Sequence, residues 1–473
     1  MSEQSAIQRA KGNDYFRQNK FFEALRCYEA AVSLCPETDK KELSILYSNL
    51  SFAQLKVERT NEALESAARA IEYDPTNTKA FYRQGQALQS SLDFKGAYDS
   101  FLAAAKIQPN VKFWRDRMEE AKKKFRGSKL REAMSSDNLL EEKTTEKEET
   151  LVDTTPLPEF TVEYARQLMD EMSQDKRPSP HIVNAMIAKM KEINLKMDNI
   201  VKLERKGIIR VVGDTHGQYQ DLRHIFTLYG EPSSENPYLF NGDYVDRGSM
   251  GIEIVLALFA WKLAIPDSIY MNRGNHETNM MNQMYGFENE CTKKYSRKMF
   301  ETFSDFFNTM PLGHILNGQV LIVHGGLFSD QSVTIDSLQS MYRISQPPES
   351  GPLNDILWSD PMEEKGLAPS PRGVTRTFGP DITENFLSKN HLDLLIRSHQ
   401  VQENGYGVMH NGKCITVFSA PNYIGQMGNK GAVVLLKFGD DLKLQSKEFQ
   451  QFDAQPIPAG YPPMKYASFP RFF

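Results

Sequence analysis

Five short apolar segments in the last two thirds of this 473-residue chain each end in a turn of small and polar residues. The segments span residues 208–212, 238–240, 268–271, 320–323 and 392–396. They have the length and composition of buried β-strands, and helical stretches such as Met250 to Leu263 separate them. Strands that alternate with helices predict an α/β domain with a central sheet.

The turns after these segments carry side chains that bind metals and phosphate. Their sequences are Gly213-Asp214-Thr215-His216-Gly217, Gly242-Asp243-Tyr244-Val245-Asp246-Arg247-Gly248, Arg273-Gly274-Asn275-His276-Glu277, His324-Gly325-Gly326 and Arg397-Ser398-His399. Ligands of α/β proteins bind at the carboxyl edge of the sheet, so these turns should converge. A single Asp there could simply stabilise a turn, and a single His could be a buried core residue. Five such turns together favour a functional site.

Oxygen and imidazole ligands without thiolates suit manganese, iron or zinc better than calcium. The six candidate side chains are more than one ion usually needs. We therefore expect two metal ions that share a carboxylate.

The first third of the chain differs, because all nine histidines follow residue 180. An internal repeat appears there when Ala24, Ala63 and Ala97 are aligned, and three further alanines and three prolines then coincide: Ala31, Ala70, Ala104, Pro36, Pro75 and Pro109. The last two units lie 34 residues apart. This pattern resembles three tetratricopeptide repeats, which are pairs of packed helices.

These patterns divide the chain into four parts. Residues 1–134 would hold the repeats and a Lys-rich capping helix from about Val111 to Ala133. Residues 135–158 are polar and acidic and predict a flexible linker. Residues 159–462 would form the domain that carries the candidate metal site, and residues 463–473 a C-terminal tail.

Charge and cysteine content exclude several classes of protein. Lys and Arg number 56 and Asp and Glu 61, so the net charge of −5 lacks the basic character of nucleic-acid binders. Four irregularly spaced cysteines form neither a disulfide framework nor a zinc ribbon. With no signal peptide or membrane span evident, we expect a cytoplasmic and nuclear protein.

The motifs GDTHG, GDYVDRG and RGNHE, followed by HGG and SH, resemble the signature of the phosphoprotein phosphatase (PPP) family from roughly Thr161 to Pro462. The resemblance implies an all-α tetratricopeptide domain followed by an α/β metallophosphatase domain, whose central β-sandwich carries a two-metal site. It also implies hydrolysis of phosphoserine and phosphothreonine in proteins, by direct attack of a water or hydroxide that bridges the metals.

The resemblance implies a set of metal ligands. The first ion would be held by Asp214, His216 and Asp243. The second would be held by Asp243, Asn275, His324 and His399. The ions would be manganese or iron, with zinc and magnesium as alternatives, because such ligands tolerate several metals.

The resemblance also implies catalytic and substrate-binding roles. His276 would protonate the leaving oxygen, and Asp246 would orient its imidazole. The residues expected to bind the substrate phosphate are Arg247, Asn275, Arg372 and Tyr423. A planar guanidinium can bind two phosphate oxygens at once, which favours arginine for this task.

The repeat domain resembles those that bind heat-shock chaperones. Its carboxylate clamp would consist of Arg9, Asn13, Asn49, Lys79 and Arg83, and its partner would be the C-terminal tail of a ninety-kilodalton chaperone. Arg9 stands where lysine is usual, which leaves the strength of binding open. A solvated basic face is the alternative interpretation.

The resemblance further implies autoinhibition in a monomeric protein. Glu58 aligns with an acidic residue that covers a catalytic arginine, so we expect it close to Arg247. The C-terminal PPMKYASFPRFF resembles a tail that packs near the active site. A chaperone tail or a fatty acid would release the inhibition.

Two other functions stay open at this point. One is a non-enzymatic chaperone adaptor whose phosphatase-like domain only binds. The other is a two-metal phosphodiesterase acting on nucleotides or nucleic acids, although the acidic net charge and the paired arginines disfavour it.

Overall fold

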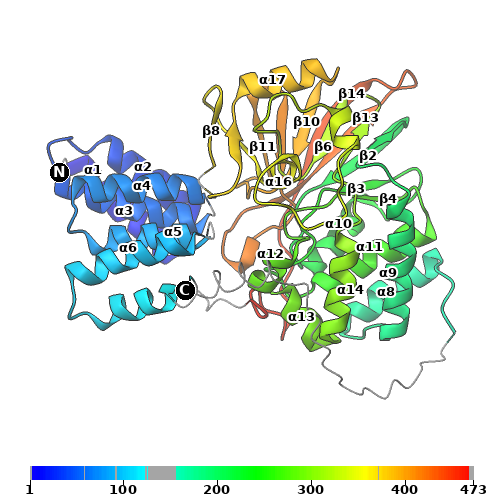
Figure 1. The fold of residues 1–473 in the computed structure, drawn as a ribbon, viewed down its shortest axis with the longest axis horizontal. Coiled ribbons are helices and arrows are strands. Elements are labelled where there is room, and N and C mark those ends of the chain that lie inside the picture. Colours follow the sequence, from blue (N-terminus) through cyan, green and yellow to red (C-terminus); the bar gives the residue numbers. More distant parts are fainter. Residues whose placement is uncertain are drawn as a thin grey trace. The chain divides into compact units, whose positions relative to one another are not determined.

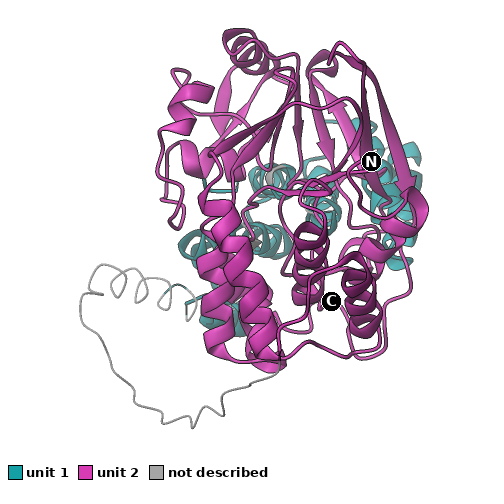
Figure 2. Ribbon diagram, turned by 90° about the vertical axis from the view of Figure 1, so that its right-hand side faces the viewer, with its two compact units in different colours: residues 1–154, 370–374 teal, residues 155–369, 375–473 magenta. Residues whose placement is uncertain are grey.

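The structure is a computed structural model that describes residues 3–57, 59–90, 93–122, 125, 156–370 and 372–467. The chain forms two compact units (Figure 2). Residues 1–154 and 370–374 belong to the first unit, and residues 155–369 and 375–473 belong to the second. Within the described ranges, all β-strands belong to the second unit.

The first unit is built from helix pairs (Figure 1). Its helices are α1 (Glu3–Arg17), α2 (Phe21–Ser33), α3 (Lys40–Lys56), α4 (Thr60–Tyr73), α5 (Thr78–Ser90) and α6 (Phe94–Ile107). The aligned alanines of the repeat are all fully buried. Small side chains there allow the helices to approach closely, and each aligned proline follows the end of α2, α4 or α6.

Residues 112–122 form a further helix after the third pair. Trp114 of this helix packs with Ala104 and Ala105 of α6, so the helix covers apolar surface of the last pair. The remainder of the expected capping helix and the linker up to residue 155 lie outside the described residues.

The second unit contains two mixed β-sheets. The six-stranded sheet has the order β1-β5-β6-β10-β12-β11, and the five-stranded sheet has the order β14-β13-β2-β3-β4. A small third sheet contains β7, β8 and β9. The strands are β1 (Ile200–Leu203), β2 (Gly207–Val212), β3 (Tyr238–Phe240), β4 (Ile269–Met271), β5 (Gly313–Leu316), β6 (Val320–Val323), β7 (Asp360–Pro361), β8 (Leu367–Pro369), β9 (Arg376–Phe378), β10 (Leu394–Arg397), β11 (Tyr406–Met409), β12 (Cys414–Val417), β13 (Gly431–Phe438) and β14 (Leu444–Phe452).

The two large sheets form the sandwich that the family resemblance implied. Ile209 and Leu239 of the five-stranded sheet share one buried cluster with Ile322 and Ile396 of the six-stranded sheet. Continuous apolar runs in these strands fit this arrangement, because helices or the other sheet cover both faces of each sheet.

Helices cover the outer faces of the sandwich (Figure 1). Against the five-stranded sheet pack α8 (Val162–Ser173), α9 (Pro180–Leu195), α10 (Tyr219–Tyr229), α11 (Gly251–Ala264), α13 (Phe287–Lys294) and α14 (Arg297–Phe307). Against the six-stranded sheet pack α15 (Ile335–Gln339), α16 (Pro352–Trp358) and α17 (Pro380–Lys389). The short α12 (Asn279–Tyr285) follows the third motif.

The five strands expected from the sequence are present as β2, β3, β4, β6 and β10. The last begins at Leu394, two residues later than expected, because Leu392 N–H still donates to the Leu387 carbonyl oxygen of α17. The four cysteines are free thiols. In the part of the chain that the structure describes, no helix has the length and apolarity needed to cross a membrane.

Candidate active site

The motif residues come together because both sheets contribute strand ends. The turns after β2, β3 and β4 bring in the ligand candidates of the five-stranded sheet, and those after β6 and β10 bring in His324 and His399. A single bridge between Asp214 and Phe418 joins the two sheets at this edge. The candidate site therefore lies where the carboxyl ends of strands from both sheets meet.

Two groups of buried side chains could each hold a metal ion. One contains His216, Asp243 and His276, and the other contains Asp243, His324 and His399. Within each group, the potential ligand atoms lie within 4.8 Å of one another. Asp243 belongs to both groups, so one carboxylate is placed to serve two ions.

The distances show how closely the ligand atoms are packed. His324 Nε2 lies 3.3 Å from Asp243 Oδ1, 3.3 Å from His399 Nδ1 and 2.8 Å from the Asn275 amide. His216 Nε2 lies 3.4 Å from an Asp243 oxygen and 3.8 Å from an Asp214 oxygen. Such a convergence of lone pairs in a dry interior fits a cation.

The electrostatics of the cluster support this fit. Burial, together with the nearby Asp243 carboxylate, raises the pKa of Asp214 to about 8. Burial and the nearby His276 lower the pKa of His216 well below its ordinary value. Divalent cations would reverse both effects, since they favour ionised carboxylates and neutral imidazoles.

His276 of the first group also pairs with Asp246. His276 Nδ1 is 2.8 Å from Asp246 Oδ2, and Asp246 also accepts hydrogen bonds from Asn282 Nδ2 (3.0 Å) and Phe287 N–H (2.8 Å). Burial raises the pKa of Asp246 to about 7, although these two hydrogen bonds oppose the shift. The sequence analysis missed Asn282, a fully buried polar residue one turn into α12.

Arg247 and Tyr423 lie beside the cluster. The guanidinium carbon of Arg247 is 3.9 Å from the Tyr285 ring centroid, and Arg247 N–H donates to the Tyr285 carbonyl oxygen. The buried Tyr423 packs against His216, with ring centroids 5.0 Å apart. Arg372 lies between β8 and β9, and its role at the substrate phosphate stays a prediction.

Five site residues have a left-handed backbone that non-glycine residues rarely adopt: His216, Asp243, Asp246, Arg247 and His399, with φ between 40° and 69°. The Glu277 carboxylate, also missed from sequence, stabilises part of this backbone. Its oxygens accept hydrogen bonds from Asp243 N–H (2.8 Å), Tyr244 N–H (2.9 Å) and Gly274 N–H (2.9 Å).

Comparison with known proteins agrees with this geometry. Residues 208–403 match the calcineurin-like phosphoesterase family, and residues 5–38 match the tetratricopeptide repeat. Serine/threonine-protein phosphatase 5 of Rattus norvegicus and of Homo sapiens are each 40% identical to this chain, with 97% of this chain and 92% of each relative covered. The chain belongs to the serine/threonine-protein phosphatase 5 family.

Two further similarities extend beyond mammals. Serine/threonine-protein phosphatase T of Trypanosoma brucei brucei is 40% identical, with 97% of this chain and 96% of the relative covered. A solved structure of a protein serine/threonine phosphatase from Saccharomyces cerevisiae, described as similar to human phosphatase PP5, covers 64% of this chain and 99% of its own, with 37% identity and a TM-score of 0.59. Membership of the phosphatase 5 family makes the chain an enzyme rather than an adaptor.

In this phosphatase 5 family member, the C-terminal stretch contacts the catalytic loops. Met464 N–H donates to the Arg247 carbonyl oxygen at 2.5 Å, and Ser249 Oγ donates to the Pro462 carbonyl oxygen. Residues 468–473 of the expected inhibitory tail lie outside the described residues. The described part of the tail is thus attached to the loop that carries Arg247.

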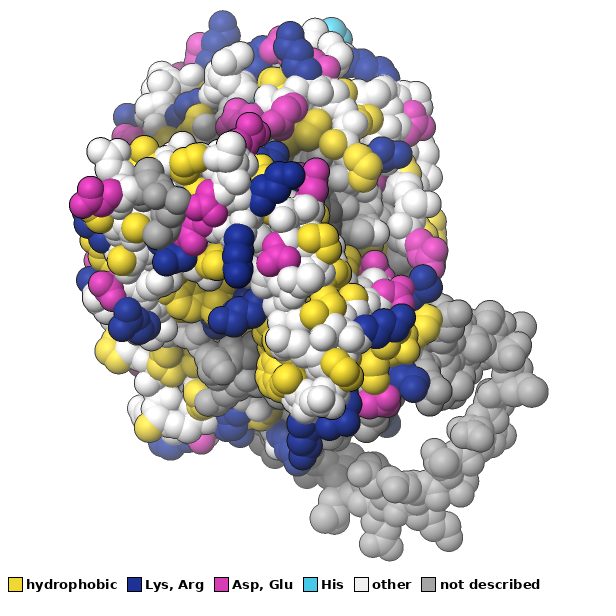
Figure 3. Space-filling model, turned by 90° about the vertical axis from the view of Figure 1, so that its left-hand side faces the viewer, with side chains coloured by type: hydrophobic (Ala, Val, Ile, Leu, Met, Phe, Trp, Pro, Cys, Tyr) yellow, Lys and Arg dark blue, Asp and Glu magenta, His cyan; other side chains and the backbone are white. Residues whose placement is uncertain are grey.

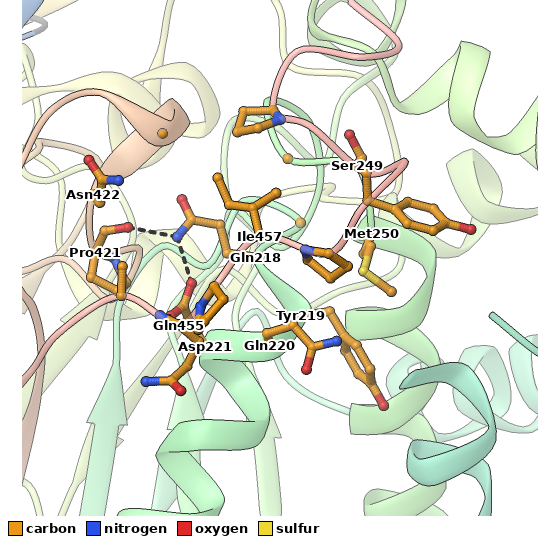
Figure 4. A pocket seen from close by; sticks show the side chains of 18 residues that line it. Gln218, Tyr219, Gln220, Asp221, Ser249, Met250, Pro421, Asn422, Gln455 and Ile457 are labelled. Atoms are coloured by element: carbon orange, nitrogen blue, oxygen red, sulfur yellow. Dashed lines mark hydrogen bonds between the residues drawn. The ribbon is translucent and has the colours of Figure 1, made fainter. Parts of the chain in front are cut away.

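The same stretch, with the loop after His216, lines a pocket of about 50 Å³ (Figure 4). Gln218 Nε2 donates to Asp221 Oδ2 and to the Pro421 carbonyl oxygen, each at 2.8 Å. The other Asp221 oxygen accepts a hydrogen bond from Gln455 N–H at 2.7 Å. Burial raises the pKa of Asp221 to about 6.

In the helical unit of this family member, the expected clamp residues differ in their contact partners and in their exposure. Arg9 forms an ion pair with Glu42, and Asn13 Oδ1 accepts a hydrogen bond from Tyr28 at 2.8 Å. Arg83 lies against the Phe52 ring, 3.3 Å from its centroid. Asn49 of α3 is partly buried and Lys79 of α5 is exposed, and Glu58 lies outside the described residues.

The space-filling view in Figure 3 shows basic and acidic side chains interspersed on the face toward the viewer. Lys56 lies on α3, the helix that also carries Asn49. Its Nζ is 5.6 Å from the Phe52 ring centroid.

Proposed function

We propose that this chain hydrolyses phosphoserine and phosphothreonine in protein substrates at the cluster formed by the five strand ends. The observation that carries this proposal is that Asp243 belongs to two groups of buried side chains that could each hold a metal ion, one of which contains His276, the partner of Asp246. Relatives named as serine/threonine-protein phosphatases support the substrate class.

The residues proposed to hold two divalent ions are Asp214, His216, Asp243, Asn275, His324 and His399. Such ions lower the pKa of a water molecule and neutralise charge on the phosphoryl oxygens. We propose manganese or iron, with zinc and magnesium as alternatives, because oxygen and imidazole ligands suit these metals. Asp243 would serve both ions.

The side chains of this site would then divide the remaining work. His276, held at Nδ1 by Asp246, would present Nε2 as the proton donor for the seryl or threonyl oxygen. Arg247 would bind phosphate oxygens, and its stacking on Tyr285 restricts where the guanidinium can point. Asn275, Tyr423 and Arg372 would complete the phosphate contacts.

We also propose that the helical unit binds the acidic C-terminal tail of a ninety-kilodalton heat-shock chaperone. The clamp side chains on α1, α3 and α5 support this, since Arg83 and Lys79 offer cationic groups to a carboxylate. Relief of autoinhibition by such a tail or by a fatty acid, with Glu58 near Arg247, rests on sequence resemblance, as does a monomeric state. Free thiols support a location in the reducing cytoplasm and nucleus.

The test is hydrolysis of a phosphoseryl peptide by the full chain with added manganese. His276→Ala should lower kcat by about 10²-fold or more, because the leaving oxygen loses its proton donor. His410→Ala is the matched control, since His410 is equally buried at 6% exposure but packs in the six-stranded sheet region, against Thr383. Equal loss of activity in both variants, with both folded, would sink the assignment of His276.

A further inference from the structure

Three helices of the first unit present the clamp side chains on connected faces. Arg9 and Asn13 lie one turn apart on α1, and the Phe16 ring that follows them is 4.6 Å from the Phe52 ring of α3. Arg83 of α5 also contacts Phe52. Side chains of α1, α3 and α5 are therefore connected through Phe52, and we call the surface that carries the expected clamp residues the recognition surface.

At one end of this surface, the cationic side chain of Arg9 already forms an ion pair with an acidic side chain of the same protein, Glu42. Arg9 Nη1 lies 2.7 Å from Glu42 Oε1 and 2.9 Å from Glu42 Oε2. The Glu42 side chain is only 11% exposed and that of Arg9 is 29% exposed, so water screens this pair less than a surface pair.

The local structure explains why Glu42 faces Arg9. Glu42 is the third residue of α3, where glutamate commonly bonds back to the N–H of the capping residue. Here the capping residue is Asp39, and its N–H already donates to the Pro36 carbonyl oxygen at 2.9 Å. The Glu42 carboxylate is thereby left to bind Arg9.

At the other end, the cationic group keeps its capacity for an anion. Arg83 donates to Gln86 Oε1 at 2.6 Å and lies on Phe52, and within the described ranges no carboxylate pairs with it. Burial lowers the pKa of Arg83 to about 10, as expected for a guanidinium without a counter-charge. Lys79 lies one turn earlier on the same helix and is exposed.

We propose that Glu42 is a built-in competitor for Arg9 on the recognition surface. The acidic tail of a partner would bind first at the Arg83 end, and it would gain Arg9 only when Glu42 releases it. Glu42 thereby weakens the binding of acidic tails and selects those that carry enough negative charge to displace it. This inference rests on the tail binding proposed above.

The experiment measures binding of a fluorescent acidic peptide with a free C-terminal carboxylate to the full chain. Glu42→Gln keeps the shape of the side chain but removes its charge, so it should tighten binding about fivefold or more. Asp14→Asn is the matched control, because it removes an acidic partner of Arg17 in an exposed pair on α1 and should leave affinity within about twofold.

The Arg9→Ala background separates competition from general charge effects. If Glu42 acts by occupying Arg9, the gain from Glu42→Gln should shrink when Arg9 is already absent. An equal gain in both backgrounds, or no gain in the native background, would overturn the competitor role while tail binding stands. Failure of both the unmodified chain and Glu42→Gln to bind the peptide would instead refute tail binding itself.

Discussion

In the helical unit, the side chains expected to bind a partner recur along helix faces, whereas in the catalytic unit each ligand candidate follows a different strand. Arg9 and Asn13 are separated by one helical turn, so local periodicity alone places them together. Asp243 and His399 are 156 residues apart in sequence and meet only through two sheets. Local helical order thus places the expected clamp residues of one helix together, whereas the ligand candidates meet only through long-range order.

The two units also differ in how tightly they hold these groups. The metal-ligand candidates are almost fully buried, and several sit on left-handed backbone that the surrounding hydrogen bonds maintain. Arg83 is partly buried and Lys79 is exposed, and both sit on ordinary helix. A metal site needs fixed distances, while an acidic tail can adapt to its binding surface.

The largest effect should come from a substitution that removes hydrogen bonds to the backbone around Asp243 but leaves every metal-ligand candidate unchanged. Glu277→Gln replaces one acceptor oxygen by an N–H₂ group that opposes a backbone N–H of Asp243, Tyr244 or Gly274. We expect manganese affinity to fall about 10- to 100-fold, as for other residues that orient metal ligands. Manganese titration followed by the thermal unfolding temperature measures this without relying on turnover.

Glu290→Gln is the matched control for that variant. The Glu290 carboxylate also accepts hydrogen bonds from backbone N–H groups, those of Gly251 and Ile252, but it does so at the start of α11. It should lower stability without weakening manganese binding. If both variants weaken manganese binding equally, the backbone around Asp243 has no special role.

The helical unit should respond to a change in charge rather than in backbone support. Arg83→Ala should weaken binding of the acidic peptide about tenfold, because a partly desolvated guanidinium is lost from the recognition surface. Arg17→Ala removes an arginine of the exposed pair on α1 and serves as the control. Fluorescence anisotropy at two salt concentrations measures the peptide affinity of both variants. Equal affinities would show that Arg83 has no special role in binding the peptide.

The smallest effect concerns the C-terminal stretch of the catalytic unit. The pKa of Asp221 is raised to about 6 in the folded chain, so the folded state binds more protons than the unfolded state between about pH 4 and 6. Stability should therefore fall as pH rises through this window, by an amount on the order of 1–2 kcal/mol from this group.

Asp221→Asn should remove that part of the pH dependence. Urea unfolding of both chains at the two ends of the window measures the difference, and the other carboxyl groups cancel in the comparison. A constant difference in the free energy of unfolding across the window would show that Asp221 does not titrate there.

Much of the fold could be predicted because its signals are local. The buried alanines Ala24, Ala63 and Ala97 mark helix contacts at a repeat spacing, and apolar runs mark β2, β3, β4, β6 and β10. The turn motifs name the ligand candidates, since Asp214, His216 and Asn275 directly follow those strands. Pattern and position within a segment were sufficient for these predictions.

Other features depend on which segments meet in space. Asn282 donates a hydrogen bond to Asp246, and Glu277 accepts one from Asp243 N–H. Neither contact could be predicted from the spacing of these residues in the sequence.

The sequence by itself determined the helix repeat, the strands and the chemistry of the turns, because hydrophobic periodicity and turn residues act over a few neighbours. Only the tertiary structure decided that Asn282 contacts Asp246, that Glu277 accepts a hydrogen bond from Asp243 N–H, and that Glu42 pairs with Arg9. Those pairings arise when the segments after β3 and β4 pack together and when α1 packs beside α3, and their electrostatic consequences follow from the burial that this packing creates.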